Sequence, residues 1–150
     1  MDYEIREIRV EDKSEILSMM KEFYSSDAVF TNGSEEIFIK DIQNCIDDNP
    51  YLEGFVFCKN GIIMGYSMIA KSFSTEFGKS CIWLEDLYLK PDYRGCGIIP
   101  EFIKYVRSLF PDAVLRLEAE DTNTHAVHVY KKLNFSRLPY IQMININKES

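Results

Sequence analysis

The order of its apolar segments constrains the fold of this chain most. Residues 55–58 and 62–69 are apolar runs that flank Asn60-Gly61, a dipeptide that favours the two-residue type I′ turn of a β-hairpin. A third apolar run follows at residues 81–89, beyond a polar turn. Three successive strands suit antiparallel pairing, so the middle of the chain predicts an antiparallel sheet.

A crossover follows the third of these strands. An apolar stripe at helical spacing predicts a helix over residues 98–110, and a strand is predicted over residues 113–119. A strand–helix–strand crossover needs a parallel pair, so we expect one α/β domain over residues 1–150 with a mixed sheet of six to seven strands and helices on both faces. The other predicted elements are strands over residues 3–9 and 140–146 and helices over residues 12–25, 34–47 and 122–133.

Two helix starts carry local signals. Asp12 and Glu15 have the spacing of a capping box, in which the side chains of the first residue and of the residue three positions later both bind backbone amides. Ser34 is a candidate N-cap for the second helix. Both signals predict where a helix begins.

Composition and charge narrow the class of protein. The 150 residues are 46% hydrophobic, which excludes a disordered chain, and the formal net charge is −7, from 17 basic and 24 acidic residues. An acidic chain is a poor general binder of nucleic acid. Residues 1–75 carry 7 basic and 14 acidic side chains, and residues 76–150 carry 10 of each, so the whole excess lies in the first half.

The same sequence indicates a cytoplasmic protein. No apolar stretch approaches 18 residues, and the N-terminus is acidic, so neither a membrane span nor a secretory signal is expected. The four cysteines contain no CxxC pair and are expected to be reduced thiols. His125 and His128 lack a partner at metal-ligand spacing, so we expect surface residues and no metal site.

Residues 87–100 run from a strand through a glycine loop into a helix. Gly95 and Gly97 allow the backbone to approach a ligand, and the free amides at the helix start can bind an anion. Arg94 and Lys90 could add positive charge at the rim. An ordinary tight turn explains the two glycines equally well, and neither the P-loop nor the dinucleotide fingerprint is present.

Two segments together resemble the GCN5-related N-acetyltransferase (GNAT) family. Residues 94–99, Arg-Gly-Cys-Gly-Ile-Ile, are similar to the Arg/Gln-x-x-Gly-x-Gly/Ala segment that wraps the pyrophosphate of acetyl-CoA in that family. Residues 123–135 are similar to its N-x-x-A-x-x-x-Y-x-x-x-G-F motif, with Asn134 where glycine is usual. Ile99 and Pro100 also depart from the pattern, and Pro100 lacks an N–H donor.

The resemblance covers nearly the whole chain and implies a GNAT-like fold and an acetyl-CoA-dependent N-acetyltransferase. Within the family, residues 83–87, Trp-Leu-Glu-Asp-Leu, are most similar to the spermidine/spermine (diamine) branch. The positions that the resemblance assigns to acetyl-CoA are Leu87, Tyr88, Leu89, Arg94, Gly95, Cys96, Gly97, Ile98, Ile99, Asn123 and Tyr130.

The resemblance also implies two catalytic residues. Tyr130 would protonate the departing thiolate, and Glu85 would take the proton of the amine directly or through water, with the Leu87 amide at the oxyanion. Considered alone, Tyr130 could be a packed aromatic and Glu85 a structural ion pair. Strict alternation would place side chains on opposite faces of the strand, with Trp83, Glu85 and Leu87 on one face and Leu84, Asp86 and Tyr88 on the other.

The acidic first half is expected to frame the acceptor. Tyr24, Asp27 and Glu85 are the candidate substrate-binding residues, and they suit a small cationic amine such as a polyamine or diamine. A solvated acidic face, an acetyltransferase for protein or peptide amines, and a non-catalytic acyl-CoA-binding module are the alternatives. Because dimerisation through C-terminal strands is common in the family, a homodimer is a further expectation.

Overall fold

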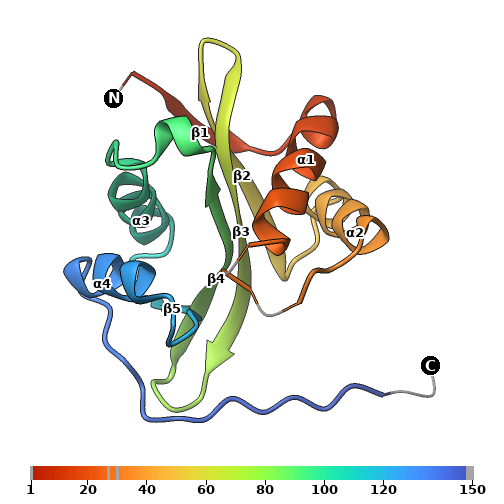
Figure 1. Ribbon diagram of the computed structural model, residues 1–150. Helices are drawn as coiled ribbons and strands as arrows, with labels where there is room; N and C mark the ends of the chain where they lie inside the picture. Colours follow the sequence, from red (N-terminus) through yellow and green to blue (C-terminus); the bar gives the residue numbers. More distant parts are fainter. Residues whose placement is uncertain (1, 27, 30, 148–150) are drawn as a thin grey trace.

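A mixed sheet with strand order β1-β2-β3-β4-β5 forms the centre of the molecule (Figure 1). The computed structural model describes residues 2–26, 28–29 and 31–147. The strands are β1 (Glu4–Glu7), β2 (Leu52–Lys59), β3 (Ile62–Ser74), β4 (Lys79–Leu89) and β5 (Val114–Leu117). The helices are α1 (Lys13–Tyr24), α2 (Glu35–Ile46), α3 (Ile98–Leu109) and α4 (Thr124–Lys132), with short 3-10 helices η1 (Val10–Asp12) and η2 (Pro91–Tyr93).

Strand pairing follows the sequence prediction in the middle of the chain. β1 to β4 pair antiparallel, and β4 and β5 pair in parallel, so the mixed sheet is confirmed. The β2–β3 turn has φ of 51° at Asn60 and 78° at Gly61, the two positive values that a type I′ turn requires. Ser34 caps α2 as predicted, because its hydroxyl accepts a hydrogen bond from the Ile37 amide.

Helices cover both faces of the sheet, as expected (Figure 1). On one face α1 and α2 bury a core that includes Met20, Ile42 and Tyr66. On the other face α3 packs Phe102 and Val106 against the sheet. In the part of the chain that the structure describes, no helix has the length and apolar character to cross a bilayer.

The predicted sixth strand is wrong. Residues 140–146 are described, yet they take part in no strand pairing, so the described residues form five strands rather than six or seven. The segment runs as an irregular tail past the turn between β3 and β4 (Figure 1). A strand pattern forms a strand only where a partner edge satisfies its backbone groups, and this tail meets none in its own chain.

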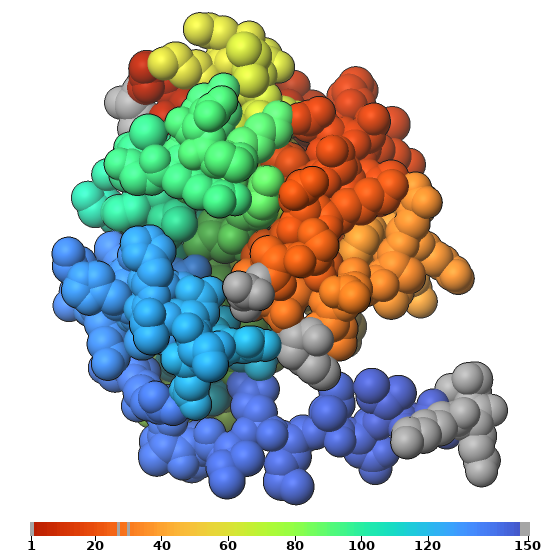
Figure 2. Space-filling view, in the orientation of Figure 1, coloured from red at the N-terminus to blue at the C-terminus, as the bar shows by residue number. Residues whose placement is uncertain are grey.

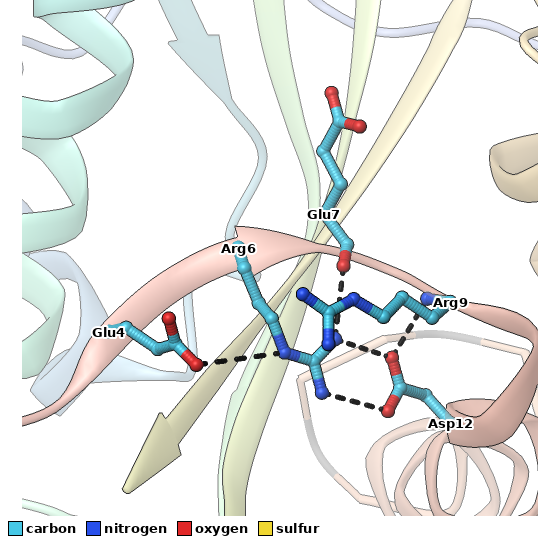
Figure 3. Close-up of polar contacts among 5 residues, drawn as sticks. All are labelled: Glu4, Arg6, Glu7, Arg9 and Asp12. Carbon is cyan, nitrogen blue, oxygen red and sulfur yellow. Dashed lines mark hydrogen bonds and ion pairs between the residues drawn. The ribbon is translucent and has the colours of Figure 1, made fainter.

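The capping box predicted at Asp12 is also wrong. The Asp12 carboxylate makes no hydrogen bond to the first turn of α1. Instead Arg6 donates to both of its oxygens, at 2.8 and 3.0 Å, and the Arg9 amide donates at 2.8 Å (Figure 3). A bidentate guanidinium is a stronger partner than a helix amide, so the carboxylate joins β1 to the start of α1.

Candidate active site

β4 contains a bulge at Glu85. Met68 of β3 pairs with Asp86 while Ile69 pairs with Leu84, so Glu85 is an extra residue in the ladder. The predicted alternation along β4 is therefore wrong beyond this point. Leu84 and Leu87 both pack toward the α3 core, whereas Asp86 contacts side chains of the α1–α2 core.

Asp86 is the most deeply buried acid of this region. Its side chain is 3% exposed, and it accepts hydrogen bonds from the hydroxyls of Tyr24, at 2.8 Å, and Tyr66, at 2.7 Å. Burial raises the pKa of Asp86, and the two tyrosine hydroxyls oppose that rise because they favour the charged carboxylate. Tyr24 is thus held in place through Asp86, while Asp27, the other residue predicted on this side, lies outside the described residues.

Glu85 stands beside several other negative charges. Its pKa is raised first by burial and then by the charges of Glu118, Asp86 and Asp41, which come from three different elements or their ends. Asp41 on α2 has a pKa of about 6, again through burial first and then through the charge of Asp86. We call Asp41, Glu85, Asp86 and Glu118 the acidic cluster.

Sequence reasoning does not distinguish Asp41 from the other acidic residues of the first half. A signal was nevertheless present, because Asp41 follows Phe38 by three positions and precedes Ile42, both of which are buried. Residues at this helical spacing share a face, so Asp41 lies at the edge of the apolar stripe of α2 rather than on its solvent side. The sequence does not mark Tyr66 as a residue of this site, because an aromatic residue in an apolar strand is ordinary in any protein core.

The edge of β4 next to β5 is open beyond the bulge. The parallel register covers Cys81–Leu84 and Val114–Leu117, and no described strand pairs with that edge further along. The Lys90 amide donates to Met64 of β3, so in an antiparallel ladder the backbone groups of Leu87 and Leu89 point to the open edge. Figure 2 shows green residues of this region at the floor of a hollow between α4 and α1.

The glycine loop has the conformation that an anion site needs. Gly95 and Gly97 have φ of 75° and 82°, and Gly97 is the residue before the first turn of α3. A Cβ at either position would meet no described atom within 4 Å, so the backbone there is open to a ligand. Cys96 is exposed between them, and Ile98 is buried in the core.

The two basic residues of the loop differ in how free their positive charges are to bind an anion. Arg94 donates through Nε to the Leu89 carbonyl at 2.9 Å and lies over the Tyr88 ring, 5.5 Å from its centroid. That geometry fixes its guanidinium beside the open edge of β4. Lys90 instead forms an ion pair with Glu15 of α1, so its charge is shared with that carboxylate.

The local backbone accommodates the three residues that depart from the family pattern, two in α3 and one after α4. Ile99 packs its side chain against the α3 core, which leaves its amide at the helix start. Pro100 lies in the first turn, where a missing N–H costs no internal hydrogen bond. Asn134 has φ of 69°, the left-handed conformation in which asparagine is the best substitute for glycine.

α4 presents the second pair of motif residues. The Asn123 side chain caps the helix by accepting from the Ala126 amide at 3.3 Å. Tyr130 is half-buried and meets Phe135 edge to face, with ring centroids 5.8 Å apart. A tyrosine hydroxyl keeps its proton at neutral pH, and burial raises the pKa of Tyr130 further above its ordinary value. His125 and His128 are exposed, as predicted.

Comparisons with known proteins agree with this geometry. Residues 13–135 match the sequence profile of the acetyltransferase (GNAT) family. A thialysine N-epsilon-acetyltransferase from Sus scrofa is 32% identical over 143 residues, covering 86% of this chain and 81% of that protein. A protein of the same name from Bos taurus is 42% identical over 74 residues, which are 47% of this chain and 43% of that protein.

Solved structures share the fold. A structure from Clostridium acetobutylicum, described as a predicted acetyltransferase with acetyl-CoA, superimposes with a TM-score of 0.76 at 19% identity and covers 95% of this chain and 96% of that one. The sequence profile, the sequence relatives and the glycine loop between β4 and α3 all indicate the same family. This chain therefore belongs to the GNAT family of acetyltransferases and is an N-acetyltransferase that uses acetyl-CoA.

Proposed function

We propose that this enzyme acetylates a primary amine of a small cationic molecule, such as a polyamine, a diamine or a lysine-like amine. The observation that carries the proposal is the position of the acidic cluster. The charge of Asp86 raises the pKa of both Asp41 and Glu85, and Asp86 itself lies on the side of β4 that α1 and α2 cover, next to the open edge where acetyl-CoA is expected. A cationic acceptor gains from several carboxylates in a partly buried site.

The names of the relatives support a side-chain amine as acceptor. Both relatives are called thialysine N-epsilon-acetyltransferase, so their acceptor nitrogen is the N-epsilon position of thialysine. The proposal extends to this chain the same class of acceptor, an amine that is protonated in water. Such an amine has a pKa of about 10.4 and must lose a proton before it can attack.

We propose direct transfer with Glu85 and Tyr130 in the roles that the motifs assign. Glu85 accepts the proton of the ammonium group, directly or through one water, and its raised pKa improves its match to that task. The amine nitrogen then attacks the acetyl carbonyl. The Leu87 amide donates to the developing oxyanion. As the C–S bond breaks, the Tyr130 hydroxyl gives its proton to the departing sulfur, and the second proton of the attacking nitrogen passes through water to restore the Tyr130 hydroxyl.

The same proposal assigns the cofactor contacts. The backbone groups of Leu87 and the amide of Leu89 would pair with the pantetheine arm, alongside Tyr88, while the Leu89 carbonyl accepts from Arg94 Nε. The loop from Arg94 to Ile99 would bind the pyrophosphate through backbone amides and one guanidinium. Asn123 and Tyr130 would border the cofactor from α4.

An acceptor panel tests the proposal. Purified enzyme with acetyl-CoA is given thialysine, spermidine and a short diamine, together with a neutral amino sugar and glutamate, and thiol release is measured. We expect kcat/KM to be highest for the cationic amines. Turnover of only the neutral or anionic amines would overturn the cationic acceptor while leaving the acetyltransferase assignment intact.

We also propose that the enzyme works in the cytoplasm. The support is that Cys45, Cys58, Cys81 and Cys96 are all unpaired thiols, as is usual in a reducing compartment.

A further inference from the structure

The charged residue of β5 lies on the side of the sheet where the acceptor is proposed to bind. Leu115 and Leu117 of β5 pack against the α3 core, so Arg116 between them points to the opposite face. Its register partner in the parallel β4–β5 pair is Trp83. Among the described residues, none from β5 belongs to the core beneath α1 and α2, so the two helices leave this part of the face open. Arg116 is half-buried there.

Arg116 is held by an aromatic ring rather than by a carboxylate. Its guanidinium carbon lies 4.6 Å from the centroid of the Trp83 ring, which is the geometry of a cation–π contact. Within the part of the chain that the structure describes, Arg116 forms no ion pair, whereas Arg6 and Arg137 each have a carboxylate partner. An aromatic ring holds a guanidinium in place but does not neutralise its charge. Arg116 therefore keeps its capacity to bind a carboxylate ligand.

Negative charges follow Arg116 along the same face. Residues two apart in an extended strand share a face and lie about 6.6–6.8 Å apart. Glu118 is two residues beyond Arg116, Glu85 is two residues beyond Trp83, and the charge of Glu118 raises the pKa of Glu85. The face thus has a positive end at Arg116 and a negative end at Glu85 and Glu118. A molecule that matches both ends carries an ammonium group and an anionic group on a short aliphatic chain.

We propose that Arg116 binds a carboxylate of the acceptor, so that the enzyme prefers an amino acid with a side-chain amine to a polyamine or a diamine. The inference rests on the proposed function, in which the reacting amine lies beside Glu85. The carboxylate of the same molecule then reaches Arg116, and the ion pair determines which end of the acceptor reacts. A second ammonium group at this place is repelled by the guanidinium. Arg116 is a specificity-determining residue and takes no part in proton transfer.

Acceptors that share one aliphatic amine test the role of Arg116. They are lysine, lysinamide, in which a neutral amide replaces the carboxylate, and cadaverine, which lacks the carboxylate altogether. We expect kcat/KM of the unmodified chain, measured with acetyl-CoA by thiol release, to be about 10- to 100-fold higher for lysine than for lysinamide, the usual effect of a hydrogen bond to a charged group. Arg116→Gln should lower kcat/KM for lysine by that factor and raise it for cadaverine, because it removes the repulsion of the second ammonium group.

Two further variants serve as controls. Arg116→Lys keeps a cation at the site and should retain part of the preference for lysine. Arg9→Gln removes an exposed positive charge after β1, at the opposite edge of the sheet, and should leave the preference unchanged. A general loss of folding in Arg116→Gln would lower kcat/KM for every acceptor, so opposite effects on lysine and cadaverine identify a loss of recognition.

The outcomes separate this inference from the proposed function. Equal kcat/KM for lysine and lysinamide would overturn the role of Arg116 and leave the cationic acceptor in place. The same conclusion would follow if Arg116→Gln kept the preferences of the unmodified chain. If the unmodified chain acetylates none of lysine, lysinamide and cadaverine, the proposed function itself is overturned, and this inference with it.

Discussion

At the residue scale, the Tyr130 hydroxyl gives the sharpest test of mechanism. A tyrosine hydroxyl keeps its proton at neutral pH, and the place of Tyr130 in α4 matches the motif. We expect Tyr130→Phe to lower kcat about 10²- to 10⁴-fold, the usual contribution of a general acid, and to leave acetyl-CoA binding intact. Steady-state kinetics measures the first effect, and a thermal-shift titration with acetyl-CoA measures the second.

Tyr105→Phe is the matched control for this change. Tyr105 lies on α3, packs against Phe55 and loses the same single oxygen. If Tyr130→Phe retains the kcat of Tyr105→Phe, the general-acid role is wrong. Bound acetyl-CoA with no turnover of any amine by the unmodified chain would favour a non-catalytic acyl-CoA-binding module instead.

The proposed acceptor site predicts a pH dependence of acceptor binding through Asp41. Its pKa of about 6 means that it gains its charge as the pH rises through that value. We expect KM for a cationic acceptor to fall between about pH 5 and 7, since the amine stays protonated throughout this range. Asp41→Asn should flatten this dependence, and initial rates over the same pH range would measure it.

The same substitution should make the protein more stable. The pKa of Asp41 is raised in the folded state, so stability is lost as the pH rises from the ordinary aspartate pKa through about 6. Asp41→Asn removes that loss of stability, so the variant should have a higher melting temperature at pH 7 than the unmodified chain. Asp112→Asn is the control, because Asp112 is exposed in the turn after α3. Equal effects of the two substitutions would contradict a specific role for Asp41.

At the scale of the element, the junction of β1 and α1 depends on one ion pair. The side chains of Arg6 and Asp12 are 16% and 6% exposed, so removing the arginine leaves a buried carboxylate without its cation. Arg6→Ala should lower the free energy of unfolding by about 3–5 kcal/mol, as measured by urea unfolding at pH 7. Arg9→Ala, an exposed neighbour whose backbone amide remains, is the control and should cost far less.

The pH dependence of this junction has a definite sign. Burial alone would raise the pKa of Asp12, but the hydrogen bonds from Arg6 and from the Arg9 amide lower it overall. The stability that the pair supplies is therefore complete above the unfolded pKa of about 3.9 and is lost as the pH falls through the folded value. Arg6→Ala and the unmodified chain should converge in stability in acid, and a constant difference would contradict this account.

The elements also show where sequence reasoning stops. Periodicity predicted all four α-helices and five strands, because each has an apolar face that its own residues reveal. Periodicity failed where a contact with a residue distant in the sequence decides the local structure. Asp12 has the spacing of a capping box, yet Arg6 takes its carboxylate. The bulge at Glu85 is invisible because strict alternation is the default for any apolar strand, and only pairing with β3 reveals the extra residue.

In the candidate site, too, local features could be predicted from the sequence, whereas contacts between distant residues could not. The conformation of the glycine loop and the caps of α4 followed from residue types and spacing, because Gly97, Asn123 and Asn134 act through local backbone geometry. The contact of Tyr24 and Tyr66 with Asp86 could not be predicted, since it joins α1, β3 and β4. The segment 140–146 could be recognised as strand-forming but not as unpaired, because strand pairing depends on how the rest of the sheet assembles.

At the scale of the whole molecule, negative charge is concentrated in the first half of the chain. Residues 1–75 carry the entire net charge of −7, and α1 and α2 lie on the face opposite to α3. The acidic half therefore borders the side on which we propose the acceptor, and the neutral half carries the loop proposed to bind the anionic cofactor. A cation approaching the acceptor side gains from charges several residues away as well as from those it contacts.

This asymmetry predicts a selective effect of salt on the acceptor. The Debye length falls from about 10 Å at 0.1 M salt to about 3 Å at 1 M, so distant carboxylates stop contributing to attraction. KM for a diamine should rise severalfold over that range, measured at saturating acetyl-CoA by thiol release. A neutral amine that the enzyme accepts is the control, and its KM should change little because it gains nothing from the acidic half. Parallel changes for both acceptors would instead place the salt effect on the cofactor or on the fold, and the acidic half would then be a solvated surface.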